Sequence, residues 1–295
     1  MIFKRRKNVS YPIFIYDAFT KEKFGGNAAG IVLDAENLST VEKQNLAKKL
    51  GFSETVFVRR SEKADFQLEY FTPKQEVDLC GHATIAAIYA LFDEKRIAKD
   101  RFEISMETRV GILSVFLERR DHVLCSVWME QDEGKLSWDL EVPEEEILSS
   151  LGLTKEDRNP NFSMGKAYSG LWDLMIPLAS KKALDGIQID FFKVEELSKK
   201  LSVISFHPFY LEGTSAYVRN FAPIVNIPEE SATGTSNGAL AFYLHQQKYL
   251  AKDEILYCQQ GESMKRKSQI LAKVSAEGKI LVGGQAVRII KGEYS

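Results

Sequence analysis

The sequence predicts an α/β protein made of two similar halves, each a sheet around one buried helix. The first observation is the stretch Leu79–Phe92, whose larger apolar residues fall at helical spacing while most other positions are alanine. A helix that is apolar on every face packs inside a protein rather than on its surface. The second observation is that this pattern recurs far downstream, and the third is that short apolar runs flank both copies.

The downstream copy repeats the order of the first. Phe71–Pro73 leads through a loop to Cys80–His82 and the first helix, and Phe221–Pro223 leads through a loop to Thr233–Thr235 and a second apolar helix. Both copies therefore run Phe-x-Pro, loop, x-Gly-polar residue, helix, and we interpret them as an internal duplication. A pair of ordinary helix caps is the alternative, since glycine, threonine and serine are common there.

Each copy opens its helix on a glycine, Gly81 or Gly234. The first turn of a helix has N–H groups without partners in the helix and carries a positive partial charge, which favours an anion. Glycine also lets another group approach the backbone closely. We therefore expect the two helix starts to face each other and to hold a carboxylate between the halves.

Strands and one capped helix precede the buried helix of the first half. Ser39 and Glu42 form the pattern of a capping box, for a helix that ends at Gly51. The strand that follows begins near Thr55, which leaves Glu54 at a helix-to-strand junction. The other expected strands of this half are residues 11–16, 31–33, 65–71, 102–106, 110–118 and 123–129, with a glycine-rich turn at 24–30.

The second half also combines strands and short helices. Pro143 is placed to start a helix that Gly152 ends, and residues 194–201 predict another short helix. Residues 154–170 are polar, and we expect them to be irregular. The expected strands are residues 168–178, 216–221, 255–260, 270–274, 279–282 and 286–290.

The composition is that of a globular protein without an electrostatic preference for nucleic acid. Of the 295 residues, 44% are hydrophobic and 27% are charged, and the formal net charge is -2. That charge predicts neither nucleic-acid binding nor attachment to an anionic membrane, and no apolar run approaches the roughly 18 residues of a membrane span. The first ten residues are basic but no apolar segment follows, so we expect a frayed tail, or a weak phosphate-binding arm, rather than a signal peptide.

Neither a cofactor nor a metal is predicted. Phe24–Gly30 is glycine-rich but is followed neither by the Gly-Lys-Ser/Thr of a phosphate-binding loop nor by a helix. His82 shows no metal-ligand spacing with the other three histidines. Cys80, Cys125 and Cys258 form neither a CxxC pair nor a disulfide framework, which favours a reducing cytoplasm.

Several short motifs, in order along the chain, resemble the phenazine-biosynthesis PhzF-like family. Each is weak evidence alone, but the ordered series runs from the first expected strand to the last. The matching motifs are Asp17–Phe19, Phe24–Gly30, Ser53–Thr55, Phe71–Pro73, Cys80–Thr84, Phe221–Pro223, Glu229–Glu230, Thr233–Gly234, Gln260–Gly261 with Met264 and Arg266, and Gly283–Gly284.

The resemblance implies the diaminopimelate-epimerase-like fold, in which two similar domains are each a curved mixed sheet around a central buried helix. Residues 8–122 would form the first domain and residues 123–283 the second, with the last strand, about 284–295, returning to the first. The resemblance also implies a homodimer, a site in the cleft between the domains and a cofactor-independent isomerase. In the family's best-known member, a glutamate moves a proton between ring carbons of a dihydro-hydroxyanthranilate.

Carried over onto this chain, the family's catalytic glutamate is Glu54. That role needs a partly buried carboxylate, for which Phe52 and Val56 provide an apolar setting. A solvated acid at a turn is the alternative. The family's Gly-His step supplies His82, which would orient substrate or relay protons, or would instead cap its helix or be a hydrogen-bonded core histidine.

The second half supplies further candidates. Glu230 stands at the aspartate of the family's Glu-Asp pair, where it would hold a substrate amine or hydroxyl or relay protons; a surface acid before a helix is the alternative. Thr235 stands at a serine or asparagine position and would be a helix cap whose hydroxyl touches the ligand. Arg266 would pair with a substrate carboxylate or be solvated. The expected substrate-binding residues are Asn27, Gly81, Thr233, Gly234, Gln260, Gly261, Met264 and Arg266.

Three functions compete. The first is an isomerase that uses Glu54 on a small carboxylate-bearing metabolite. The second is a two-thiol racemase or epimerase on the same fold, which needs a cysteine before each helix; Cys80 occupies one such place, but Thr233 occupies the other and cannot act as a thiolate. The third is a small-molecule binding protein whose cleft is catalytically silent, which an assay alone separates from the first.

Overall fold

The computed structural model describes residues 10–295, so most of the basic tail lies outside the described residues. The chain divides into two compact units: unit 1 comprises the residues up to Val127 together with Gln285–Ser295, and unit 2 comprises Trp128–Gly284. Within residues 10–295, no helix is both long and apolar enough to cross a membrane.

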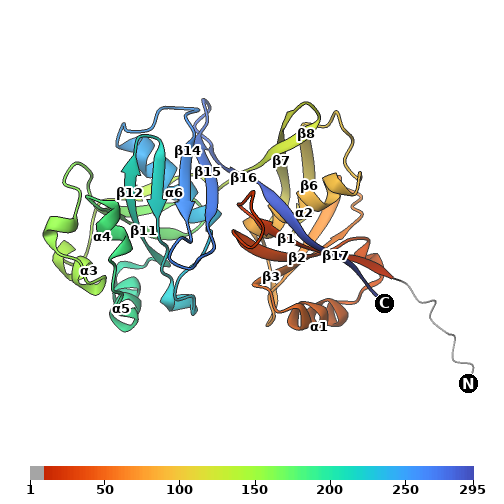
Figure 1. Ribbon diagram of the computed structural model, residues 1–295, viewed down its shortest axis with the longest axis horizontal. Helices are drawn as coiled ribbons and strands as arrows, with labels where there is room; N and C mark the ends of the chain where they lie inside the picture. Colours follow the sequence, from red (N-terminus) through yellow and green to blue (C-terminus); the bar gives the residue numbers. More distant parts are fainter. Residues whose placement is uncertain (1–9) are drawn as a thin grey trace, which may run out of the picture. The chain divides into compact units, whose positions relative to one another are not determined.

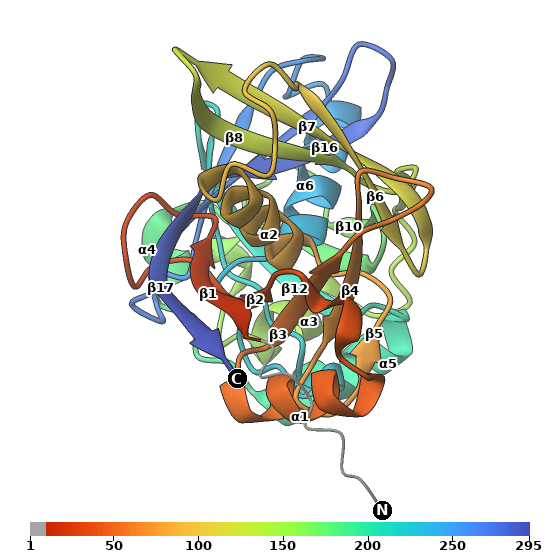
Figure 2. The ribbon, with the colours of Figure 1, turned by 90° about the vertical axis from the view of Figure 1, so that its right-hand side faces the viewer.

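Unit 1 is a mixed sheet around the helix α2. The strands lie in the order β17, β1, β2, β3, β4, β6 and β7; the pairs β2–β3 and β4–β6 are parallel and the others antiparallel. Helix α2 packs against β1, β2, β3 and β17 (Figure 2). The elements are β1 Tyr11–Ala18, β2 Asn27–Val32, the 3-10 helix η1 Ala35–Asn37, α1 Thr40–Leu50, β3 Glu54–Arg59, β4 Phe66–Phe71, β5 Glu76–Val77, α2 Gly81–Asp93, β6 Glu103–Thr108, β7 Gly111–Arg120, β8 Val123–Glu130, which runs on into unit 2, and β17 Ala286–Tyr294.

Unit 2 repeats this plan around α6. Its strands lie in the order β9, β10, β11, β12, β13, β14, β15 and β16, again with two parallel pairs, β11–β12 and β13–β14, at the corresponding places. Helix α6 packs against β10, β11, β15 and β16 (Figure 1). The elements are β9 Lys135–Ser137, α3 Glu144–Ser150, η2 Lys155–Asp157, β10 Gly165–Tyr168, β11 Trp172–Pro177, α4 Lys181–Asp185, α5 Phe191–Leu201, β12 Ser205–Glu212, β13 Ser215–Val218, η3 Pro223–Val225, α6 Gly234–Gln246, β14 Leu256–Gln260, β15 Ser268–Val274 and β16 Ile280–Gly284.

The same series of parallel and antiparallel pairs in both units confirms the predicted fold class. Both central helices are buried as expected: every residue of α2 from His82 to Leu91 is buried, and α6 is buried along most of its length. A shorter helix packs on each sheet as well. Leu46 of α1 joins a core with Phe57, and Val194 of α5 joins a core with Phe206.

Local capping signals are confirmed at the first helix. The Ser39 side chain accepts from the Glu42 backbone N–H, and the Glu42 carboxylate accepts from the Ser39 N–H. Gly51 closes the helix with a left-handed backbone, φ 72°. Each signal involves residues only three or four positions apart, Ser39 with Glu42 and Gly51 with Ala47, which is why the sequence is sufficient to predict them.

Several strand predictions need correction. Strand β2 begins at Asn27, four residues before the predicted start. The expected strand 168–178 begins at the last residue of β10 and continues through a turn into β11, and the region expected to be irregular, 154–170, contains η2 and β10. Strand β12 was not predicted, because His207 and Pro208 interrupt its apolar pattern and proline is rare inside sheets.

Candidate active site

Glu54 is held at the edge of unit 1 by the elements on either side of it. Gly51 ends α1, and β3 begins three residues later at Glu54, which pairs in parallel register with Ala29 of β2. The Glu54 carboxylate lies 3.2 Å from Nε2 of His82, and the two side chains are 20% and 8% exposed. Glu54 is thus neither a solvated surface acid nor a fully buried one.

His82 has polar neighbours at both ring nitrogens. Nδ1 lies 3.4 Å from Nδ2 of Asn27, and Nε2 lies 3.3 Å from Oγ of Ser53. When the Asn27 amide donates to Nδ1, the neutral imidazole carries its hydrogen on Nε2 and donates to the Glu54 carboxylate. In that tautomer the ring gives the Glu54 carboxylate a hydrogen-bond donor at 3.2 Å.

The start of α2 leaves open space beside its backbone. Cys80 precedes the helix in an extended conformation without a side-chain cap, and a Cβ on Gly81 would meet nothing within 4 Å. Behind the first turn, the Thr84 hydroxyl donates to the Cys80 carbonyl at 2.8 Å and lies 2.6 Å from the hydroxyl of Tyr70. The inner side of the helix start is therefore anchored, and its outer side can receive a ligand.

The start of α6 in unit 2 is held by one buried amide. Gln260, 1% exposed, accepts from the Thr233 N–H at 3.2 Å and from Nδ2 of Asn237 at 2.8 Å through the same oxygen. Its Nε2 donates to the Glu230 carbonyl at 2.8 Å and to the Thr233 hydroxyl at 3.2 Å. Gln260 thus orders the turn that leads into Gly234, and we expect it to act on a ligand through that turn.

The acidic pair before α6 is divided between two environments. Glu229 forms a two-pronged ion pair with Arg219, at 2.9 and 2.8 Å, and accepts from Ser263. Glu230 is half-buried, and its backbone N–H donates to the Asn220 carbonyl. The charge of Glu229 is thus compensated within unit 2.

The expectation that Thr235 caps its helix is wrong. Thr233 is the residue before the helix, and Thr235 lies inside the first turn with its hydroxyl 3.4 Å from Oε1 of Gln131. A cap needs extended backbone just before the helix, and that place is taken by the residue two positions earlier.

The loop after β14 depends on Gly261. Its φ is +78°, and a Cβ there would lie 2.4 Å from the Arg266 carbonyl oxygen and 2.7 Å from that of Ser231. Its own carbonyl accepts from the N–H groups of Met264 and Arg266. The loop is therefore a tight turn that presents the half-exposed side chains of Met264 and Arg266.

The structure therefore groups the predicted residues into two sets. Asn27, Glu54, Gly81 and His82 lie together in unit 1. The second set lies around the start of α6 in unit 2 and consists of Glu230, Thr233, Gly234, Thr235, Gln260, Gly261, Met264 and Arg266. Ser53, a neighbour of His82, was not predicted as a site residue, although it stands directly beside Glu54 in the sequence.

A buried polar network in unit 2 was also missed. Asp173 and His207 are fully buried; Oδ1 of Asp173 accepts from Ser205 at 2.5 Å, and Asn220 lies 2.7 Å from that hydroxyl and 3.1 Å from Nδ1 of His207. Burial raises the pKa of Asp173 to about 7, and burial lowers the pKa of His207 to about 4. The available signal was an aspartate inside the otherwise apolar strand 172–177.

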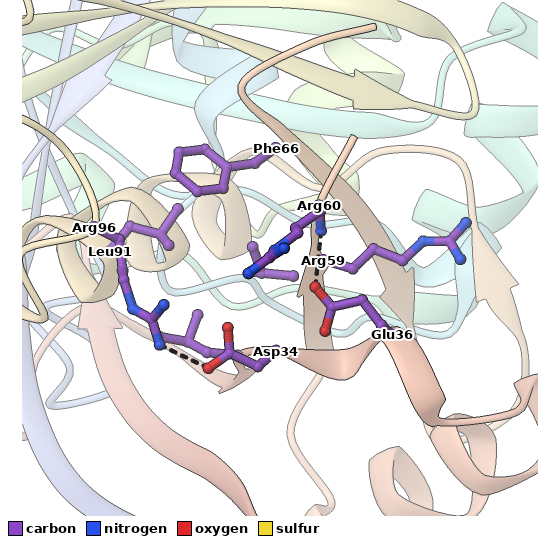
Figure 3. A pocket seen from close by; sticks show the side chains of 9 residues that line it. Asp34, Glu36, Arg59, Arg60, Phe66, Leu91 and Arg96 are labelled. Carbon is purple, nitrogen blue, oxygen red and sulfur yellow. Dashed lines mark hydrogen bonds and ion pairs between the residues drawn. The ribbon is translucent and has the colours of Figure 1, made fainter. Parts of the chain in front are cut away.

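A separate pocket of about 160 Å³ lies elsewhere in unit 1. Asp34 pairs with Arg96 at its rim, and Arg60 extends over it while Arg59 points away (Figure 3). None of the predicted site residues lines this pocket, whose lining is Leu33, Asp34, Glu36, Val58, Arg59, Arg60, Phe66, Leu91 and Arg96.

Comparison with known proteins supplies the family. Residues 16–292 match the family model described as phenazine biosynthesis-like protein. An uncharacterized isomerase of Clostridium acetobutylicum is 31% identical over 301 residues, which covers 96% of this chain and 97% of the relative. The trans-2,3-dihydro-3-hydroxyanthranilate isomerase of Pseudomonas aeruginosa is 26% identical over 265 residues and 90% of each chain. The crystal structure of a Bacillus anthracis phenazine biosynthesis protein of the PhzF family superposes with a TM-score of 0.87 at 29% identity, covering 97% of this chain and 99% of that one.

Proposed function

The chain belongs to the phenazine biosynthesis-like protein family and is an isomerase, and from this premise we propose that it moves a proton between two carbons of a small carboxylate-bearing metabolite, with Glu54 as the base. The observation that carries the proposal is the 3.2 Å contact between the Glu54 carboxylate and Nε2 of His82. The Glu54 side chain is 20% exposed, and the space beside Gly81 at the start of α2 is open. A donor on the carboxylate and an open approach are what a general base requires.

In the proposed mechanism, the Glu54 carboxylate removes a proton from a carbon of the substrate. The electron pair of that C–H bond shifts a double bond, and the neutral Glu54 acid returns the proton at a second carbon, with no change of redox state. His82 stays a neutral hydrogen-bond donor to Glu54 and keeps it oriented in both protonation states. Asn27 sets the imidazole tautomer from the other side of the ring.

Backbone donors would hold the substrate carboxylate. The N–H groups of the first turn of α2, beside Gly81, have no partners inside the helix and carry the positive end of its dipole. Preorganised N–H donors also stabilise an oxyanion that develops next to the carbon being deprotonated. We propose that Glu230, Thr233, Gly234 and Thr235 at the corresponding turn of α6, and Gly261, Met264 and Arg266 in the loop after β14, also contact substrate.

The substrate class follows from the family together with this chemistry. The Pseudomonas aeruginosa relative is named for a cyclic hydroxy-amino carboxylate, and a base beside an anion-binding helix start suits such an acid. We therefore propose small carboxylic acids with an acidic C–H next to a double bond, cyclic ones included. We further propose that the chain acts in the cytoplasm. We also propose that it forms a homodimer, which a measurement of its mass in solution at micromolar concentration tests directly.

Exchange of solvent deuterium tests the proposed base. Glu54→Gln keeps the size and hydrogen-bonding capacity of the side chain but removes the basic oxygen, so exchange into substrate or product should fall about 10²–10⁴-fold while ligand binding persists. Glu62→Gln is the matched control, because it removes an equal charge from an exposed position of unit 1 and should leave the exchange rate unchanged.

Two outcomes would contradict the proposal. Exchange at the wild-type rate in Glu54→Gln would exclude Glu54 as the base. Ligand binding without exchange or turnover across a broad panel of cyclic and amino acids would instead favour a silent binding protein. A two-thiol mechanism predicts that Cys80→Ser is as damaging as loss of a base, whereas we expect the larger loss in Glu54→Gln.

A further inference from the structure

The pocket of about 160 Å³ in unit 1 lies at the opposite end of the elements that hold the candidate active site. Glu54 is the first residue of β3, whereas Val58, near the end of that strand, lines the pocket. His82 is the second residue of α2, whereas Leu91, near its end, lines the pocket. The rise per residue of a strand and of a helix places the two sites roughly 13 Å apart along both elements. The pocket is therefore a separate site.

One wall of the pocket is apolar. Leu33, Val58 and Leu91 are 2%, 3% and 2% exposed, and Phe66 is half-buried. Figure 3 shows Phe66 and Leu91 on the same side of the hollow. A volume of about 160 Å³ is close to the roughly 150 Å³ of an apolar cavity that holds benzene. The pocket therefore has room for one six-membered ring and not for two fused rings.

The rim of the pocket is charged, and one of its cations has no counterion. Asp34 pairs with Arg96 at 2.7 Å. The Glu36 carboxylate accepts from the backbone N–H of Arg60 at 3.1 Å. Within residues 10–295, no carboxylate forms an ion pair with the guanidinium of Arg60, which extends over the pocket (Figure 3). The Arg60 guanidinium is thus the cation that a ligand can use.

We propose that this pocket binds a small monocarboxylic acid with a single ring, of which benzoate is the simplest example. The ring would lie against the apolar wall, and the carboxylate would accept two parallel hydrogen bonds from the Arg60 guanidinium, the geometry that arginine favours. Asp34 and Glu36 stand at the same rim and would repel a second negative charge. Dicarboxylates and phosphate dianions should therefore be rejected.

The rim is held in place before any ligand arrives. The Asp34–Arg96 pair joins the segment after β2 to the segment after α2. The Arg96 N–H donates to the Leu91 carbonyl at 2.8 Å, and Asp34 has a left-handed backbone with φ 56°. A pocket formed in advance loses less conformational entropy when it binds a ligand. The alternative is a solvated arginine beside a hollow that holds only water.

The test is a titration with benzoate, followed by NMR of the methyl groups of leucine and valine. We expect the methyl signals of Leu33, Val58 and Leu91 to shift together and to saturate with a Kd of about 1 mM or below. Toluene lacks the carboxylate, phthalate adds a second one, and 1-naphthoate adds a second ring. Each of these three should bind at least about tenfold more weakly than benzoate.

Two neighbouring arginines provide a matched pair of variants. Arg60→Gln removes the charge that faces the ligand, so benzoate binding should weaken at least about tenfold. Arg59→Gln removes the same charge one residue away, from a side chain that points away from the pocket and lies 3.4 Å from Glu69 (Figure 3). That control should change the Kd by less than about twofold, because only the long-range field is altered.

Three results would overturn the pocket as a carboxylate site. The first is the absence of a saturable shift at the three methyl groups with up to 10 mM benzoate, about tenfold above the expected Kd. The second is an equal loss of affinity in Arg60→Gln and Arg59→Gln. The third is toluene binding as tightly as benzoate. The inference does not rest on the proposed function: Glu54→Gln should bind benzoate in this pocket as the wild type does, whatever its deuterium exchange.

Discussion

The starts of α2 and α6 have the same backbone conformation but different side chains around them. Each helix has 13 residues and opens on glycine after an extended residue, Cys80 at φ −146°, ψ 114° and Thr233 at φ −126°, ψ 106°. Three residues into each helix, a side chain donates back to the carbonyl of the residue before the helix: Thr84 in α2 and Asn237 in α6. The duplication therefore extends to individual hydrogen bonds.

The strands β3 and β12, which hold corresponding places in the two sheets, show where the two copies diverge. Strand β3 begins three residues after the left-handed residue that closes α1, and β12 begins three residues after the left-handed residue that closes α5. Glu54 thus corresponds to Ser205. The Glu54 side chain is 20% exposed and contacts His82, whereas Ser205 is buried and donates to Asp173.

The two helix starts therefore differ in the kinds of side chain that surround them. Unit 1 gathers a carboxylate, a thiol and an imidazole around an open helix start, while unit 2 surrounds its helix start with buried amides and hydroxyls that bond mainly to one another. Substitutions around α2 should therefore change activity more than stability, and substitutions around α6 should do the opposite.

The largest expected effect is on the pH dependence of stability in unit 2. Burial raises the pKa of Asp173 from 3.8 to about 7, so between these values the folded chain holds a proton that the unfolded chain has released, and stability falls as pH rises. Burial lowers the pKa of His207 from 6.5 to about 4, so its contribution is lost as pH falls through that window. The two slopes oppose each other in the wild type.

Of these two contributions to the pH dependence of the unfolding free energy, Asp173→Asn should leave only that of His207. Relative to the wild type, the variant should gain stability with rising pH by about 1.4 kcal/mol per pH unit between pH 4 and 7, or about 4 kcal/mol at most. Urea unfolding at pH 5, 6, 7 and 8 measures this, with His207→Gln expected to show the opposite slope. If the unfolding free energies of Asp173→Asn and of the wild type changed in parallel with pH, the pKa of Asp173 would not change on folding.

The next effect concerns the amide that holds the start of α6. Gln260→Ala removes the acceptor of the Thr233 N–H and of the Asn237 side chain, which should cost about 2–4 kcal/mol of unfolding free energy because buried donors lose their partners. Gln269→Ala, an exposed glutamine on the neighbouring strand β15, should change stability by less than about 0.5 kcal/mol. Equal losses in the two variants would refute the structural role of Gln260.

Ser205→Ala probes the position that corresponds to Glu54. The substitution takes a hydrogen-bond partner from Asp173 and from Asn220, so we expect a loss of about 1–3 kcal/mol in stability and no change in deuterium exchange at a temperature where the variant is folded. A large loss of exchange in the folded variant would mean that both copies contribute to the chemistry.

The smallest effect on stability is expected from Gly81→Ala. A Cβ at this position meets no atom within 4 Å, so stability should change by less than about 0.5 kcal/mol. The added methyl group would, however, occupy the approach to the helix start and displace the substrate, lowering the exchange rate about tenfold or more. Unaltered exchange would show that the substrate does not approach α2 from this side.

Features that depend on neighbouring residues were determined by the sequence alone. The burial of α2, its start at Gly81, and the capping box from Ser39 to Glu42 all follow from patterns within one or two helical turns. The recurrence of Phe-x-Pro and glycine before a second helix was enough to predict two similar halves. Asn27, Glu54 and His82 came from separate motifs, and their catalytic role stays a prediction.

The tertiary structure decided what each polar side chain contacts. Nothing near Glu54 in the sequence specifies that its partner is an imidazole from α2, nor that the Cys80 thiol lies beside the same imidazole. Likewise, Asp173, Ser205 and Asn220 come from three separate segments whose bonds form because the sheet brings them into one dry interior. Partner choice and burial are set by pairing between distant strands, and burial is what shifts the pKa of a side chain by several units.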